Sequence, residues 1–208
     1  MTKFKTLLAS AAIAAASVSM AAPVHAQARS VAVISTDGAI QGSQAWQNAQ
    51  TAIRTTYAAQ IQQLQTRQTA LQTELQALQT AYQTAAQAPN ATQETVRPSA
   101  TALQQKQQAA QQELGQLQAP VARSEGYVRE QIAVHLDASA KAAMNAKGVD
   151  LAIRPEAVVV TTSDNANLTS AVIAELNKRV QNVGVTPPAN WQPGQTIRAA
   201  QAQQQPAQ

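Results

Sequence analysis

The sequence predicts an α+β protein in which a long antiparallel α-helical hairpin, a coiled-coil arm, projects from a small β-strand body with a C-terminal helix. Three observations support this prediction. Of the 33 Gln residues, 23 lie between Gln41 and Gln118, interspersed with Ala, and both residues are good helix formers. Leu recurs in the same stretch at spacings of three and four, as in a heptad repeat. Short β-branched segments flank the stretch on both sides.

The first 26 residues have the three parts of a secretory signal peptide. Lys3 and Lys5 precede an apolar run over 7–22, and Val24-His25-Ala26 is a small-residue pattern suited to cleavage after Ala26. A run of about 16 residues is shorter than the roughly 20 that span a bilayer, so we expect cleavage and export. Cleavage removes two of 15 basic residues and leaves 13 against 11 acidic ones, a net charge of +2.

The outgoing half of the arm follows a predicted strand. Val31 to Thr36 is β-branched and predicts that strand, and Asp37-Gly38 predicts a break after it. From Ser43 the spacing becomes helical, and we expect one helix to Ala88, where Pro89 stops it. An extra four-residue step near Tyr57 interrupts the heptad spacing. The apolar positions of this helix include Leu64, Leu71, Leu75 and Leu78.

The returning half of the arm starts after a turn predicted over 88–99. We expect its helix to begin near Pro98, since proline is tolerated in a first turn, and to end at Lys147-Gly148 with a glycine cap. Pro120, close to Gly115, predicts a kink inside it. Two interpretations remain open: a hinge at Gly115 and Pro120, or a curve around the partner helix. The apolar positions Leu114, Leu117 and Val121 complete, with the four leucines above, what we call the arm seam.

The chain beyond the arm predicts a return to the body. Residues 149–153 and 157–162 predict a second and a third strand. A final helix is expected over 167–181, because apolar residues recur there on one face. Residues 184–208 are rich in Pro and Gln and predict a disordered tail. Trp191 in this polar tail suggests docking on a surface that the sequence does not identify.

These elements divide the chain into a signal peptide (1–26), a discontinuous body (29–42 and 137–183), the arm (43–136) and the tail (184–208). So small a body, in a chain without cysteine, commonly needs association for stability. We therefore expect the bodies to oligomerise. The residues assigned to this oligomerisation surface are Val31, Val33, Leu151, Ile153, Val158 and Val160.

The sequence lacks the residue patterns that are typical of catalytic sites. No motif for a nucleotide, a metal ion or a catalytic nucleophile is present. His135 has no second His or Cys near it to complete a metal site, and a place on a helix surface explains it better. The acidic residues are scattered, and the basic ones do not cluster as in nucleic-acid-binding proteins. We predict no enzymatic activity, no cofactor, no metal and no nucleic-acid partner.

A long surface of paired helices remains, apolar along a narrow seam and rich in Gln and Thr elsewhere. Such a surface suits the binding of many partners without a large apolar patch that would self-associate. The same pattern suits a coiled-coil spacer or adaptor that holds no client. Periodicity alone leaves both functions open.

The segments on either side of the arm resemble the Skp/OmpH-like periplasmic chaperones. Val31-Ala32-Val33-Ile34 is similar to the strand that precedes the hairpin in that family, and Val149-Asp150-Leu151 to the strand that follows it. The stretch 158–164 is similar to the next strand and its polar turn, and 167–177 to the closing helix. The similarity extends from about Val31 to Val180, with the arm matched in length and period.

The resemblance implies a homotrimer whose strands form a central body and whose arms enclose unfolded outer-membrane β-barrel proteins in the periplasm. Such a holdase prevents aggregation without ATP. Well-known members carry many basic residues on their arms, which contact membrane surfaces and clients. Here the arm has only six, namely Arg54, Arg67, Arg97, Lys106, Arg123 and Arg129. We therefore expect client binding to depend more on apolar and Gln contacts, and we transfer no lipopolysaccharide-binding residue.

Overall fold

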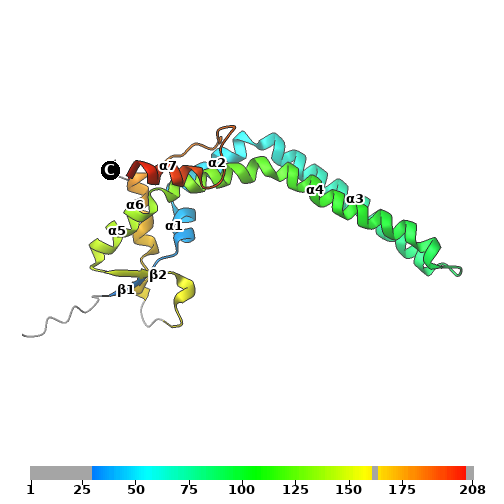
Figure 1. The fold of residues 1–208 in the computed structure, drawn as a ribbon, viewed down its shortest axis with the longest axis horizontal. Coiled ribbons are helices and arrows are strands. Elements are labelled where there is room, and N and C mark those ends of the chain that lie inside the picture. Colours follow the sequence, from blue (N-terminus) through cyan, green and yellow to red (C-terminus); the bar gives the residue numbers. More distant parts are fainter. Residues whose placement is uncertain (1–29, 161–163, 205–208) are drawn as a thin grey trace, which may run out of the picture.

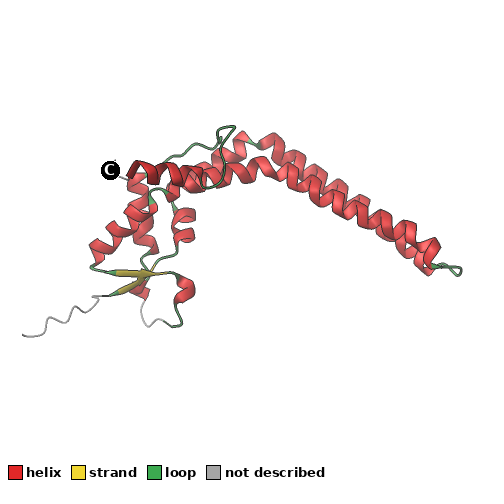
Figure 2. Cartoon of the chain, viewed as in Figure 1, coloured by secondary structure: helices red, strands yellow, loops and turns green. Residues whose placement is uncertain are grey.

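The chain forms a small body that carries a long, two-helix arm (Figure 1). The structure is a computed structural model and describes residues 30–160 and 164–204; the expected signal peptide lies outside them. Within these residues helices dominate and β structure is limited to one small sheet (Figure 2). The predicted α+β class, with a helical hairpin on a strand-containing body, is confirmed.

The body is built on two parallel strands, β1 (Val31–Val33) and β2 (Leu151–Ile153), with Ala32 opposite Ala152. Parallel strands need a long crossover connection, and here the whole arm lies within it. On the other side of β1, Val33 forms an isolated parallel bridge with Asn167. The strands expected before and after the hairpin therefore meet.

The third strand predicted over 157–162 is wrong for the described residues. Pro155–Ala157 form the 3-10 helix η1, where Pro155 has no N–H to donate to a sheet. The residues after it, as far as Val160, have no strand structure. A second 3-10 turn, η2 (Asp164–Ala166), leads to the bridge at Asn167. Next to β1, on the side away from β2, the described chain contributes this single bridge.

Three helices complete the body. In α1 (Thr36–Gly42), the Ser35 side chain accepts a hydrogen bond from the Gly38 N–H at 3.0 Å, so Asp37-Gly38 begins a helix instead of breaking the chain. The returning helix, predicted as one piece to Lys147, is divided at the turn 134–135. Its second piece is α5 (Leu136–Lys147), which ends at Gly148, whose φ of 65° makes the predicted glycine cap. Helix α6 (Thr169–Arg179) is the predicted closing helix. Its buried Val172 and Leu176 pack into a core shared with β1 and α1. The same core includes Ile53, Val128 and Ile132 of the arm, and we call this part of the arm its root.

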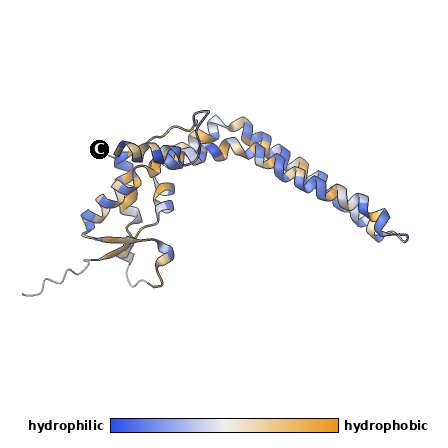
Figure 3. Ribbon diagram, in the orientation of Figure 1, coloured by the Kyte–Doolittle hydropathy of each residue, from blue (hydrophilic) through white to orange (hydrophobic). Residues whose placement is uncertain are grey.

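The arm consists of α2 (Gln44–Thr56) and α3 (Ala58–Gln87) on the way out and α4 (Gln93–Ala133) on the way back. The outgoing helix, predicted as one piece, is divided at Tyr57, which has the non-helical angles φ −107° and ψ 23°. Helix α4 is about 60 Å long at 1.5 Å per residue. Along the arm, hydrophilic residues predominate and hydrophobic ones recur at intervals (Figure 3).

Helix α4 begins at Gln93, earlier than the predicted start near Pro98. The Thr92 side chain accepts from the Thr95 N–H, and the Thr95 side chain accepts from the Thr92 N–H, which completes a capping box. Two threonines at this spacing make a weaker sequence signal than Pro98 does. Pro98 and Pro120 both lie inside α4, which continues through them as one helix.

The tail is ordered as far as it is described, so the prediction of disorder is wrong for residues 184–204. It runs back along the root of the arm and ends in α7 (Gln195–Gln204), which packs on α4 (Figure 1). Trp191 is buried, with 6% of its surface exposed. Among the described residues, none of the helices combines the length and the hydropathy needed to cross a membrane.

Candidate functional site on the arm and the body edge

The arm seam is the contact between α3 and α4, and it is only partly closed. Leu71 is buried, with 2% of its surface exposed. The other six predicted seam residues are half-buried, namely Leu64, Leu75, Leu78, Leu114, Leu117 and Val121. Two helices cannot enclose an apolar stripe on all sides, so the rims of these side chains stay within reach of a binding partner.

A groove of about 440 Å³ lies between α3 and α4 beside this seam. Its lining combines Ala59 and Ala70 with Gln63 of α3 and Leu117 of α4, and it includes Arg67 and Glu113. The groove thus mixes small, apolar, amide and charged side chains. Such a surface accepts extended chain segments of varied sequence better than one fixed ligand.

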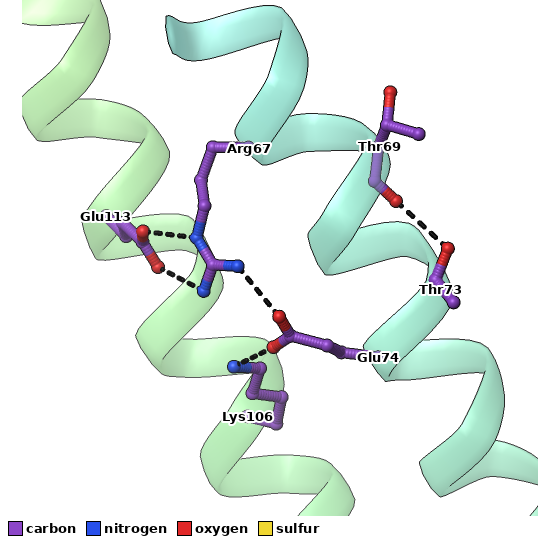
Figure 4. Close-up of polar contacts among 6 residues, drawn as sticks. All are labelled: Arg67, Thr69, Thr73, Glu74, Lys106 and Glu113. Carbon is purple, nitrogen blue, oxygen red and sulfur yellow. Dashed lines mark hydrogen bonds and ion pairs between the residues drawn. The ribbon is translucent and has the colours of Figure 1, made fainter.

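A network of four charged residues joins the two helices of the arm (Figure 4). The Arg67 guanidinium donates from Nε and Nη2 to the two carboxylate oxygens of Glu113, at 2.5 and 3.0 Å. It also donates from Nη1 to Glu74 at 2.7 Å, and Lys106 of α4 pairs with the other oxygen of Glu74. Two of these three ion pairs, Arg67–Glu113 and Lys106–Glu74, cross from one helix to the other and so favour one register of α3 against α4, whereas Arg67–Glu74 lies within α3.

The network changes the protonation of its carboxyl groups. Hydrogen bonds from Lys106 first, and from Arg67 second, hold the pKa of Glu74 below its usual value. The Arg67 hydrogen bonds do the same to the pKa of Glu113, and the two carboxylates raise the pKa of Arg67 further above neutrality. The two carboxyl groups and the Arg67 guanidinium are therefore charged over the physiological range of pH.

The two residues of the predicted hinge lie on the exposed side of α4. A Cβ added at Gly115 would meet no neighbour within 4 Å, and Pro120 is exposed. Neither residue is held by packing against α3, which is a condition for bending there. A hinge at this place stays a prediction.

The six residues assigned to the oligomerisation surface lie at one end of the body. Val31 and Leu151, paired across the sheet, are 46% and 51% exposed. Val33, Ile153 and Val158 are half-buried, and Val160 is 80% exposed. Within the described part of the chain, β2 pairs with β1 alone, so its other edge has unpaired backbone groups. An apolar sheet edge of this kind is a template for pairing with another chain.

The described residues include no group of three or more His, Cys, Asp or Glu placed to hold a metal ion. His135 lies half-buried at the junction of α4 and α5, where its backbone N–H donates to the Ile132 carbonyl at 3.0 Å.

The sequence interpretation missed the contacts between the tail and the root of the arm. They involve Arg123, Glu130 and Trp191, and of these the sequence singled out Trp191 alone. A lone Trp in a polar segment was the available signal. The partner of Trp191 lies in α4, too far along the chain for local patterns to reveal it.

Comparison with known proteins gives one family and one structure. The family described as "Outer membrane protein (OmpH-like)" matches residues 30–176. A crystal structure of an OmpH-like protein from Caulobacter crescentus CB15, proposed to be an outer membrane chaperone, is similar over 75% of this chain and 88% of that chain. The sequence identity is 24% and the TM-score 0.46. No curated protein matches the chain.

Proposed function

The chain belongs to the OmpH-like outer membrane protein family, and from this membership we propose that it is a periplasmic chaperone for unfolded outer-membrane proteins. We propose further that it works as an ATP-independent holdase, with clients bound between helical arms. The observation that carries the proposal is the family match over 30–176, which includes both strands, the whole arm and most of α6. The proposed clients are a class of proteins, the β-barrel proteins of the outer membrane.

The surface of the arm supports this role physically. An unfolded barrel protein exposes apolar side chains and unpaired backbone amides along its whole length. The half-buried rims of the arm seam offer weak apolar contacts, and the Gln and Thr side chains around them offer hydrogen bonds of both kinds. Many weak contacts without a fixed geometry hold a chain yet leave it free to be released.

The body supports assembly into a homotrimer. In the proposed assembly the exposed edge of β2 and the apolar side chains of Val31 and Leu151 are covered by neighbouring copies. Covering them would remove the unpaired edge that one chain exposes by itself. Three arms attached to such a core would surround a common space for the client.

A second function, that of a rigid spacer or adaptor, is favoured by one observation. The network of Arg67, Glu74, Lys106 and Glu113 ties α3 to α4 in a fixed register. A spacer needs such stiffness, whereas a holdase needs arms that adapt to clients. An experiment can separate the two functions, because a holdase binds an unfolded protein and a spacer does not.

The test is to dilute a urea-unfolded outer-membrane β-barrel protein into buffer with and without the purified protein lacking residues 1–26. Light scattering measures aggregation, and chromatography with mass determination measures the complex. The chaperone proposal expects suppressed scattering at about one trimer per client and a complex of defined mass, without ATP. Undiminished aggregation in the presence of a well-folded oligomer would instead favour the spacer. A matched reaction with a folded soluble protein as additive controls for unspecific crowding.

A further inference from the structure

The segment after α6 is bound to the root of the arm from its first residues. Asn48 of α2 donates to the Gln181 carbonyl at 3.1 Å. Gln131 of α4 donates to the Gly184 carbonyl at 2.8 Å and accepts from the Gly184 N–H at 3.0 Å. These contacts begin within a few residues of the end of α6 at Arg179. So few residues separate α6 from these contacts that the segment cannot reach the arm of another copy, and it therefore packs on its own chain.

Arg123 of α4 binds the next part of the segment. Its Nη2 group faces the carbonyl oxygens of Pro188, Ala189 and Trp191, each at 2.8 Å. A cation surrounded by backbone carbonyls neutralises a cluster of acceptors that would otherwise repel one another. Arg123 thus holds this loop in a closed turn against the arm.

Trp191 is the apolar anchor. Its ring packs edge-on against Tyr127 of α4, with centroids 5.4 Å apart and an interplanar angle of 70°. The ring also lies close to Gly126, where a Cβ would be 3.4 Å from the indole, within van der Waals contact. The indole N–H donates to the Thr196 hydroxyl at 3.0 Å, so the buried polar atom is satisfied.

Glu130 binds the start of α7. Its carboxylate accepts hydrogen bonds from the N–H groups of Gly194 and, at 3.0 Å, of Thr196. Glu130 is only 9% exposed, which is low for a charged residue. Gly194 directly precedes α7 and Thr196 lies in its first turn, where a negative charge is favoured by the helix dipole. A residue of α4 therefore caps a helix that follows it by more than sixty positions.

We propose that residues 181–204 are an intramolecular strap. The strap fixes the root of the arm to the body and limits the rotation of the arm relative to the body. The arm joins the body at two breaks in the helices, Ser43 between α1 and α2 and the turn at 134–135 between α4 and α5. The strap starts from α6 in the body, crosses to α2 and follows α4 beyond that turn. The proposal goes beyond the chaperone function, because it concerns the arm whatever the arm binds.

The first test measures whether the strap is anchored as described. Trp191→Ala removes the anchor, and Glu130→Gln weakens the cap of α7 because an amide has one acceptor where the carboxylate has two. Hydrogen exchange of the amides over 184–200 is expected to become about 100-fold faster in Trp191→Ala. Glu125→Gln is the matched control on the same helix, since Glu125 contacts Gln50 and its exchange profile should equal that of the parent. Unchanged exchange in both test variants would contradict the proposal.

The second test measures how widely the position of the arm varies relative to the body. The chain has no cysteine, so spin labels can be placed at Ala138→Cys on α5 and Gln65→Cys on α3, both exposed positions. Labelled chain is diluted with unlabelled chain, so that distances within one copy dominate. The distance distribution should be narrow in the parent and in Glu125→Gln and clearly broader in Trp191→Ala. A released strap with an unchanged distribution would overturn the proposal, whether or not the variant still protects clients from aggregation.

Discussion

Arg67 of α3 and Glu113 of α4 form a bidentate ion pair between the two helices of the arm. Both carboxylate oxygens accept hydrogen bonds from the one guanidinium group. The sequence places these residues on separate helices, and the register of the hairpin brings them together. Bidentate geometry makes the pair more specific than a single contact. Its groups are about 30–40% exposed, so its contribution to stability is small and sensitive to salt.

The first prediction concerns pH. The pKa values of Glu74 and Glu113 are lowered in the folded arm, so the network stabilises the arm fully above the ordinary glutamate pKa of 4.5. That stabilisation is lost as the pH falls through the lowered values. Glu74→Gln/Glu113→Gln should therefore melt slightly below the parent at pH 7, and the difference should vanish near pH 2. Thermal unfolding followed by circular dichroism measures both, and a difference that persists at pH 2 would contradict the assignment.

The second prediction concerns the closed part of the arm seam. Leu71→Ala should lower the free energy of unfolding by about 2–5 kcal/mol, because it leaves a cavity at a buried position between α3 and α4. Gln72→Ala, one residue along and exposed, is the control and should change it by less than about 0.5 kcal/mol. Urea unfolding measures both, and equal effects would show that the seam is not closed at Leu71.

The third prediction uses two glycines with opposite expected signs. Gly148→Ala should destabilise the body by about 1–2 kcal/mol, since the φ of 65° is unfavourable for a residue with a side chain. Gly115→Ala should stabilise α4 by about 0.5–1 kcal/mol, because the position is helical and has free space around it. Denaturant unfolding of both variants measures the signs. If bending at Gly115 serves client binding, the same variant will also bind clients less well.

The fourth prediction tests the proposed assembly. Leu151→Lys places a charge on the exposed sheet residue and should weaken self-association by at least about 100-fold, since burial of an unpaired charge costs several kcal/mol. Sedimentation equilibrium over a range of concentrations measures the change. Gln72→Lys on the arm should leave the oligomer mass unaltered. An unchanged mass for both variants would place the interface elsewhere.

The arm could be predicted from the sequence because its information is local. Heptad spacing places Leu71 in the seam, and Gly148 after Lys147 marks the end of α5, without any knowledge of the rest of the chain. The errors arose where a local signal misled. Pro98 is a stronger mark of a helix start than Thr92, yet the hydrogen bonds between Thr92 and Thr95 begin the helix earlier. The valines after Pro155 favour a strand, but no neighbouring strand lies beside them in the described chain.

The sequence by itself determined the helical hairpin, the strands on either side of it and the closing helix, since each depends on residues within a few positions of one another. Only the tertiary structure decided how the tail is bound. Proline and glutamine predict disorder in isolation, because a polar segment cannot bury enough surface to offset its loss of conformational entropy. Here α4 supplies the missing surface: Tyr127 packs edge-on against Trp191, and Glu130 caps α7. Contacts between residues so far apart in the chain exist only after the arm has folded.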